Sequence, residues 1–257
     1  MYYHLVNPKP ENVQVVERFH LVLLAQLGTR LDKKLYVLKG GCNLRFFWKS
    51  IRYSKDIDFD VHTIAKQTLQ NNVRKILEGP ALTQILRAAG IQVTRISEPK
   101  QTPTTQRWKV HLETESSGID LPTRIEFSRR KFGPGIVFGP ADSEIITAYN
   151  LRPVIASHYG LETAFSQKVA ALLNRKETQA RDIFDLEFLS QRGATGSAVK
   201  TDRTRLATAC EIVTSVTHEQ FLSQVVAYLP PEYHDYYHTR KTWDTIREHV
   251  IRTLEAL

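Results

Sequence analysis

The stretch Asp56–Val61 constrains the fold more than any other part of this 257-residue sequence. Aspartate alternates there with an apolar side chain, which is the two-residue period of a β-strand with one buried face. The face predicted to enter the core carries Ile57, Phe59 and Val61. The opposite face carries three aspartates, Asp56, Asp58 and Asp60. A strand with a strongly acidic face is therefore expected here.

Such a face has a chemical use. Carboxylates two residues apart on a strand lie about 6.6 Å apart at Cα, close enough for their oxygens to converge on one or two divalent ions. Without a cation, like charges on one strand face repel each other. Mg²⁺, or Mn²⁺ in its place, suits a set of oxygen ligands. The alternative is an exposed edge strand whose solvated acidic face discourages aggregation.

A glycine pair precedes this strand. Gly40 and Gly41 stand between the apolar run 35–38 and an expected helix through Leu44 and Trp48. Two missing Cβ atoms allow a phosphate to approach the backbone, and a helix N-terminus offers free N–H groups. An ordinary strand-to-helix turn explains the pair equally well, and no P-loop or GxGxxG spacing is present. Beside an Asp-x-Asp strand, the pair would place a triphosphate next to its metals.

Two blocks of residues carry a family resemblance. Lys39–Arg45 and Arg52–Phe59 resemble the KGGxxLR…RxSxDIDF signature of the AbiEii/AbiGii-type nucleotidyltransferase toxins. That family includes the MenT toxins and belongs to the polymerase-β-like nucleotidyltransferase superfamily. Cys42 stands where Thr or Ser is commoner, which removes a possible hydroxyl contact to phosphate. A third block, 168–186, is similar to the family's KxxALxxR…RDxxDL element.

The resemblance implies roles for individual residues. The implied metal ligands are Asp56, Asp58 and, from a neighbouring strand-like stretch, Glu126. The implied nucleotide-binding residues are Lys39, Gly40, Gly41, Arg45, Arg52, Ser54 and Lys168. Asp182 would assist near the acceptor. Simpler explanations stay open: Glu126 as a surface partner of Arg124 or Arg129, Arg52 as a brace of its loop, and Lys168 with Asp182 as a salt bridge between packed helices.

The resemblance also implies an activity. It predicts a bacterial toxin that transfers NMP from an NTP to RNA, most simply the tRNA 3′ acceptor end, in a Mg²⁺-dependent reaction that blocks aminoacylation. A cognate antitoxin would be its protein partner. The formal charge of +8 suits such polyanionic substrates. Two alternatives are transfer of a nucleotidyl or phosphoryl group to a protein such as the antitoxin, and a catalytically inactive module that binds RNA or a partner.

Patterning predicts an α+β fold in two domains. The resemblance implies that residues 1–153 form a polymerase-β-like mixed sheet with flanking helices. Patterning predicts an all-helical C-terminal domain over residues 154–257, with a boundary within ten residues of Pro153. Expected helices cover 11–31 and 67–89, and expected strands 35–38, 56–61, 91–96, 106–114 and 123–128. Two cysteines exclude a disulfide framework, no apolar run approaches a membrane span, and Met1–His4 lacks signal-peptide features. A cytoplasmic location is expected.

Overall fold

The computed structural model describes residues 10–115 and 117–257, so the start Met1–His4 lies outside the described residues. The chain divides into two compact units, Glu11–Tyr159 and Gly160–Leu257. The expected boundary at Pro153 falls six residues before this division. The division is later because β7 (Ile155–Tyr159) pairs with strands of the first unit.

Within the first unit, seven described strands form one mixed sheet in the order β3-β4-β5-β2-β1-β7-β6. The central strands are β1 (Tyr36–Lys39), β2 (Asp56–Val61) and β5 (Leu121–Arg129), followed outward by β4 (Thr105–Thr114) and β3 (Ile91–Gln101). β2 pairs with β1 antiparallel and with β5 parallel. The strand β6 (Ile136–Pro140) pairs with β7 at the other edge.

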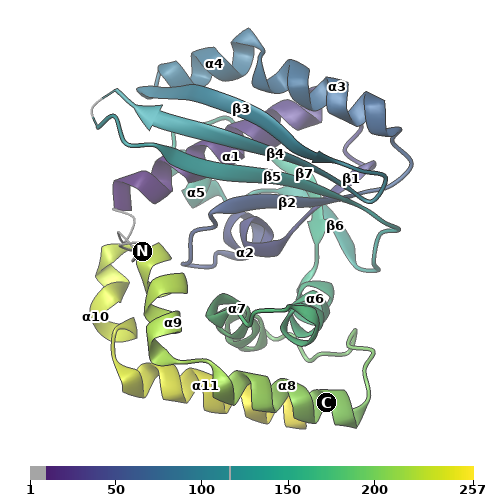
Figure 1. Ribbon diagram of the computed structural model, residues 1–257, viewed down its shortest axis with the longest axis vertical. Helices are drawn as coiled ribbons and strands as arrows, with labels where there is room; N and C mark the ends of the chain where they lie inside the picture. The colour runs from purple at the N-terminus through teal and green to yellow at the C-terminus, as the bar shows by residue number, and fades with distance from the viewer. Residues whose placement is uncertain (1–9, 116) are drawn as a thin grey trace. The chain divides into compact units, whose positions relative to one another are not determined.

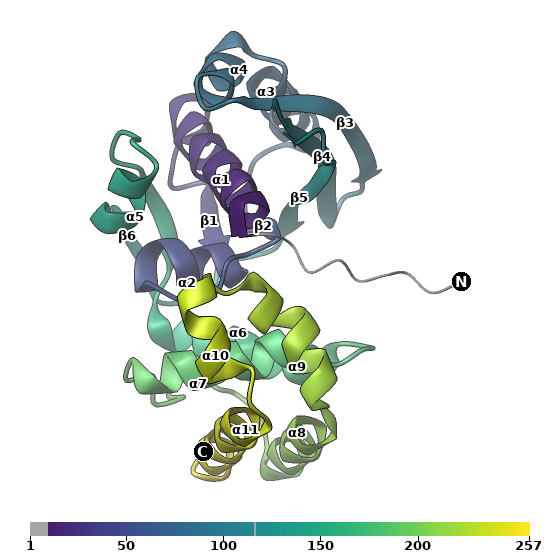
Figure 2. The same cartoon turned by 90° about the vertical axis from the view of Figure 1, so that its left-hand side faces the viewer.

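The core of this unit lies between the sheet and three helices. Ile57, Phe59 and Val61 are fully buried, as the alternation predicted. They join one apolar cluster with side chains of α1 (Pro10–Arg30), α3 (Lys66–Leu77) and α4 (Pro80–Arg87), which cover that face of the sheet (Figure 1; Figure 2). The opposite face of β2 and β5 carries the acidic residues. Helix α2 (Gly40–Trp48) follows β1 directly, and α5 (Ser143–Ala148) lies between β6 and β7 in the chain.

The single helix expected over 67–89 is instead two helices, so this prediction was wrong. Gly79 and Pro80 separate α3 from α4, and Pro80 occupies the first turn of α4. Proline removes a backbone donor and clashes with the preceding turn inside a helix, whereas its fixed φ suits a helix start. The Gly-Pro pair therefore ends one helix and begins the next.

The second unit is helical throughout its described length. Its helices are α6 (Leu161–Asn174), α7 (Ala180–Gln191), α8 (Arg203–Ser215), α9 (His218–Gln224), α10 (His234–Tyr237) and α11 (Arg240–Glu255), with 3₁₀ turns at Val226–Tyr228 and Pro231–Tyr233. Helix α7 packs against α6, α9 and α11 around buried Phe165, Leu186 and Trp243. No described helix of the chain combines the length and the apolar character of a membrane span.

Candidate active site

The acidic residues of β2 and β5 are neighbours across a pair of parallel strands. Asp58 is the register partner of Glu126 on β5 and of Lys39 on β1. Asp56 stands opposite Arg124 in the same ladder. Partners in a ladder project to the same face, and adjacent strands lie about 4.8 Å apart. The strand order thus brings the three sequence-predicted carboxylates together, with Asp58 in the middle.

Arginines hold the outer two carboxylates. Arg124 Nη2 lies 2.7 Å from Asp56 Oδ2, and Arg107 Nη2 lies 2.6 Å from Glu126 Oε2. Glu126 leaves the core face as expected, since Ile125 and Phe127 are fully buried. The partner of Glu126 is Arg107 on β4, rather than the Arg124 or Arg129 considered from the sequence. Arg129 instead donates to the carbonyl oxygen of Ile64.

The surroundings of Asp58 disfavour a negative charge on its carboxyl. Burial raises the pKa of its carboxyl, and the charge of Asp56 raises it further. Lys39 and Arg124 offset part of this increase in the pKa, whereas Glu126 adds to it. A carboxylate crowded by two others gains most from a bound cation. The electrostatics therefore match a divalent-ion site centred on Asp58.

Asp60, the third aspartate of the strand, is bound differently. It is 2% exposed and accepts contacts from Lys39 Nζ at 2.5 Å, Arg130 Nε at 3.1 Å and the Tyr159 hydroxyl at 2.8 Å. These three donors compensate its charge inside the protein. Lys39 thus lies opposite Asp58 in the ladder and ion-pairs with Asp60. This contact fixes its ammonium beside Asp56, Asp58 and Glu126, which together form the carboxylate row.

The two glycines are required by close packing at the start of α2. Gly40 has φ +68°, and a Cβ there would stand 3.2 Å from Asp58 Oδ2. A Cβ on Gly41 would stand 2.6 Å from Ser54 Oγ and 3.1 Å from Arg52 Nη2. Any larger side chain would therefore displace Asp58 or the segment 52–54. The diglycine brings the free N–H groups of the α2 N-terminus next to the carboxylate row.

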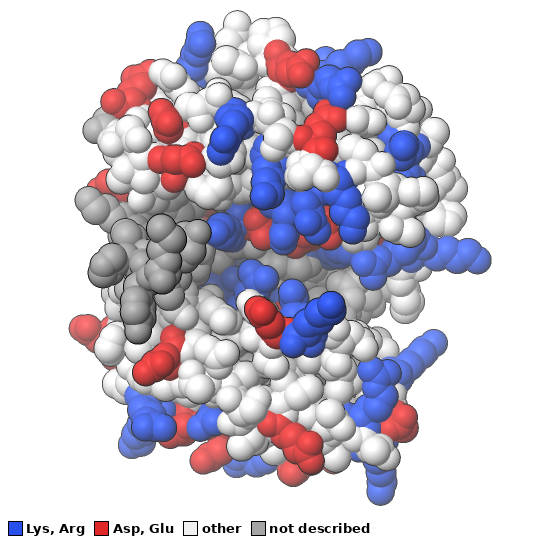
Figure 3. Space-filling model, viewed as in Figure 1, with Lys and Arg blue, Asp and Glu red and all other residues white. Residues whose placement is uncertain are grey.

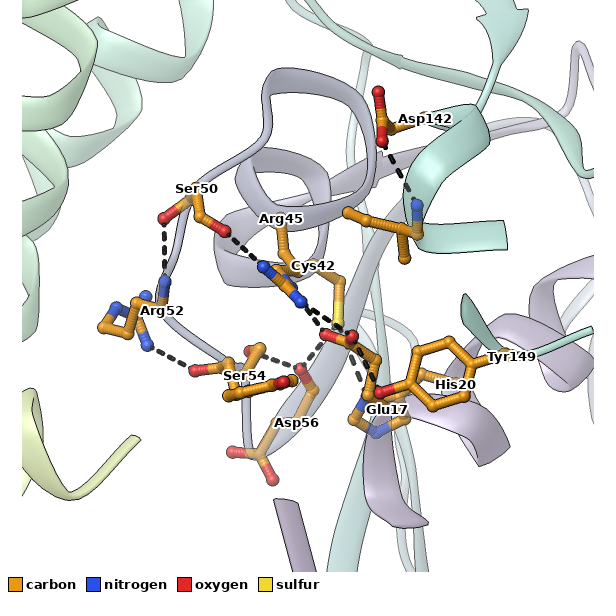
Figure 4. Close-up of polar contacts among 12 residues, drawn as sticks. Glu17, His20, Cys42, Arg45, Ser50, Arg52, Ser54, Asp56, Asp142 and Tyr149 are labelled. Atoms are coloured by element: carbon orange, nitrogen blue, oxygen red, sulfur yellow. Dashed lines mark hydrogen bonds and ion pairs between the residues drawn. The ribbon is translucent and has the colours of Figure 1, made fainter. Parts of the chain in front are cut away.

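A network of polar contacts behind the site fixes the segment that leads into β2 (Figure 4). Ser54 Oγ and Cys42 Sγ both donate to the Asp56 carbonyl oxygen, at 2.8 and 3.3 Å. Cys42 Sγ also contacts His20 Nδ1 on α1 at 3.5 Å, and burial lowers the pKa of His20 to about 3, so this histidine is neutral. The Cys42 side chain is thus buried under the Asp56 backbone.

Arg45 and Arg52 both contact the backbone of the segment 50–53, and Arg45 also contacts α1. Arg45 donates to both oxygens of Glu17, at 2.8 and 3.1 Å, and to the Ser50 carbonyl oxygen at 2.9 Å. The Tyr149 hydroxyl donates to Glu17 as well, at 3.0 Å. Arg52 is 4% exposed and donates to the Tyr53 carbonyl oxygen at 3.0 Å. Glu17, His20 and Tyr149 carry no motif in the sequence, so only the structure reveals their part in this network.

The remaining predicted residues lie in the helical unit and form a buried ion cluster of their own. Lys168 Nζ lies 2.9 Å from Asp182 Oδ1 and 2.6 Å from Asp185 Oδ2. Arg175 Nε lies 2.7 Å from Asp182 Oδ2. Both aspartates are fully buried. The blocks 168–175 and 181–186 are therefore brought together by the packing of α6 on α7.

Comparison with known proteins assigns the chain to a family. The family described as "Nucleotidyl transferase AbiEii toxin, Type IV TA system" matches residues 22–253. This chain belongs to the AbiEii nucleotidyltransferase toxin family. It is thus a nucleotidyltransferase toxin of the toxin–antitoxin type, and this membership implies an NTP as substrate and an antitoxin as partner. No curated protein matches the sequence significantly.

Solved structures share the fold of this AbiEii family member. MenT4, a nucleotidyltransferase toxin from Mycobacterium tuberculosis, superposes with a TM-score of 0.70 at 17% identity, covering 96% of this chain and 85% of MenT4. A putative nucleotidyltransferase from Helicobacter pylori gives 0.62 at 20% identity, covering 96% and 97%. JHP933 from Helicobacter pylori gives 0.60 at 20% identity, covering 95% and 94%. The expected nucleotidyltransferase fold is therefore confirmed.

The residues present fit a divalent metal, although the described residues contain no ready cluster of three ligands. The donor set is all oxygen, and Asp58 stands between Asp56 and Glu126 with an unfavourable charge. Asp56 and Glu126 would have to exchange their arginine partners for the ion. In the structure of this AbiEii family member, Arg107 and Arg124 hold these two carboxylates in ion pairs.

Proposed function

We propose that the protein transfers NMP from an NTP to the 3′ hydroxyl of an RNA, most simply the tRNA acceptor end, and that this reaction depends on Mg²⁺ or Mn²⁺. The observation that carries the proposal is the ladder pairing of Asp58 with Glu126, next to Asp56 and to the diglycine at the start of α2. Modification of the tRNA 3′ end would block aminoacylation and hence translation. This block would explain why the protein is toxic.

Each group of this site has a proposed task. Asp56, Asp58 and Glu126 hold the divalent ions, which supply charge neutralisation at the α-phosphate and activation of the acceptor hydroxyl. The Gly40–Gly41 backbone and Ser54 receive the triphosphate, with the ammonium of Lys39 beside it. The acceptor oxygen bonds to the α-phosphorus, the bond to the bridging oxygen breaks, pyrophosphate leaves, and the hydroxyl proton is lost to solvent.

The contacts favour a supporting task for two of the arginines. The guanidinium of Arg45 donates to the Glu17 carboxylate and the Ser50 carbonyl oxygen, and it lies 4.5 Å from the centre of the Tyr53 ring. We therefore propose that Arg45 braces the segment 50–54. Arg52, buried in the same segment, would brace it too and present its outer nitrogen near Gly41.

For Lys168 and Asp182 the proposal rests on the family resemblance. Lys168 would bind the nucleotide, and Asp182 would assist near the acceptor. Their mutual ion pair is compatible with these tasks only if the Lys168 ammonium exchanges part of its contact with Asp182 and Asp185 for phosphate.

One assay separates the acceptor classes. The purified protein is incubated with each α-labelled NTP, total tRNA and the candidate antitoxin, in Mg²⁺, in Mn²⁺ or in EDTA. The proposal predicts label on RNA that depends on the metal. Label on protein but never on RNA would establish the protein-acceptor alternative. Growth arrest and RNA binding that survive Asp58→Ala would establish a non-catalytic binding module.

A further inference from the structure

The sheet face that carries the carboxylates continues outward over β4 and β3 as a basic surface. Along β4, Trp108, Val110 and Leu112 are fully buried, so Arg107 and Lys109 project to the opposite face, which is also the face of Glu126. Figure 3 shows Lys and Arg side chains crowded around a smaller group of Asp and Glu over these strands.

The ladder register gives the order of charges across this face. Arg107 is the partner of Glu126 on one side and of Lys100 on the other. Lys109 is the partner of Arg124 and of Ser97. With strands about 4.8 Å apart, Lys100 lies about 10 Å from Glu126 at the backbone. Along this row the charges thus change from the carboxylate of Glu126 on β5 to the cations of Arg107 on β4 and Lys100 on β3 within two strand spacings.

Two cations of this face are available for a ligand. Lys100 and Lys109 are exposed, and neither forms an ion pair within the described residues. Arg95, on the same face, contacts the His111 ring at 2.8 Å, and His111 in turn contacts Asp120. On the opposite side of Asp58, the sheet continues through Lys39 on β1 to β7. Tyr159 of β7 is buried, so the carboxylates are enclosed by the protein on that side.

We propose that this basic track, formed by Lys100, Arg107 and Lys109, binds the phosphate backbone of the RNA acceptor, with the terminal 3′ hydroxyl at Asp58 and Glu126. This inference rests on the proposed function and specifies how its substrate is bound. A nucleic-acid strand carries one phosphate per nucleotide directly behind its terminal hydroxyl, which matches a row of cations that begins beside the reacting carboxylates. In an acidic protein acceptor, by contrast, no regularly spaced row of negative charges follows the hydroxyl side chain that would be modified.

The chemistry of the track also predicts what it recognises. Its side chains are cations suited to phosphate oxygens, and contacts to phosphate position a nucleic acid without reading its bases. The track should therefore bind single-stranded RNA ends of different sequence with similar affinity.

The test measures RNA binding without NTP, so that it is independent of the transfer reaction. The probes are a 5′-fluorescein single-stranded RNA 12-mer ending in CCA, a 12-mer with a scrambled sequence, and total tRNA. The double variant Lys100→Ala/Lys109→Ala is compared with Lys75→Ala/Arg87→Ala, which removes the same charge from exposed positions on α3 and α4, over the opposite face of the sheet.

We expect the track variant to bind both 12-mers about tenfold more weakly at 0.1 M salt, with the slope of log Kd against log salt reduced by about 1.4 for two lost phosphate contacts. Its KM for RNA should rise while its KM for NTP stays unchanged. Equal losses in the two double variants would overturn the track and leave the proposed function standing, provided that the wild type labels RNA. Wild-type protein that labels only the antitoxin and binds none of the RNA probes would overturn both.

Discussion

Asp58 and Glu126 stand directly opposite each other on two adjacent parallel strands, with Lys39 and Arg107 as the next partners on either side. Two carboxylates in such a position repel each other, and the cations beside them offset only part of that repulsion. The row is therefore electrostatically incomplete at its centre, where the pKa of Asp58 is raised. Without a bound cation, the repulsion among these carboxylates should lower the stability of the folded protein.

Replacing Asp58 with asparagine should reveal this loss of stability as a change in how the free energy of unfolding depends on pH. A raised pKa means that the folded protein holds the Asp58 proton more tightly than the unfolded chain does, so stability is lost as pH rises from the ordinary Asp pKa of about 3.9 through the raised value. In EDTA, the free energy of unfolding of Asp58→Asn should therefore increase relative to wild type between pH 3.5 and pH 7.5. A relative decrease over that interval would contradict the electrostatic account of Asp58.

Binding of the divalent ion should stabilise the wild-type protein. At a Mg²⁺ concentration ten times its Kd, the gain is about 1.4 kcal/mol, or about 3–5 °C in Tm. Asp58→Asn and Glu126→Gln should abolish this shift, whereas Glu113→Gln, on the neighbouring strand β4, should retain it. Thermal unfolding with Mg²⁺ and with EDTA measures the difference. An equal Mg²⁺ shift in all four proteins would place the ion elsewhere.

Arg45 is expected to act on stability more than on nucleotide binding. Burial raises the pKa of Glu17 against the lowering influence of Arg45, so Arg45→Ala leaves a buried carboxyl without its main partner. Loss of one partner of a buried ion pair costs about 3–5 kcal/mol, which denaturant unfolding would detect. In the double variant Glu17→Gln/Arg45→Ala, part of that loss should be recovered. Undiminished stability together with weaker NTP binding would instead make Arg45 a phosphate contact.

Lys168 is expected to contribute to nucleotide binding. Loss of a charge-assisted contact to phosphate, worth about 1.5–3 kcal/mol, should raise the Kd for NTP about 10- to 150-fold in Lys168→Ala. Arg175→Ala is the matched control, because it removes the other cation that pairs with Asp182. NTP titration of both folded variants makes the comparison. Unchanged affinity in Lys168→Ala would remove this residue from the site.

Local patterns sufficed for the elements that carry the site. The period of residues 56–61 predicted both the strand and the face of each side chain, and the apolar neighbours of Glu126 did the same for β5. The ion pairs Asp56–Arg124 and Glu126–Arg107 could not be predicted, because they depend on strand order, which arises from contacts distant in sequence. The strands β6 and β7 were missed for a related reason: each is short, and Pro134 and Pro153 interrupt the pattern before them.

The most direct test of the central claim is metal-dependent transfer of labelled NMP to RNA by wild type, Asp58→Asn, Glu126→Gln and Glu113→Gln. If Asp58 and Glu126 together hold the divalent ions, both of their variants should lose transfer by about 10³-fold or more, since the charge stabilisation of the transition state is lost. Glu113→Gln should transfer as wild type does. Transfer that persists in Asp58→Asn or Glu126→Gln, at rates close to those of Glu113→Gln, would contradict the account.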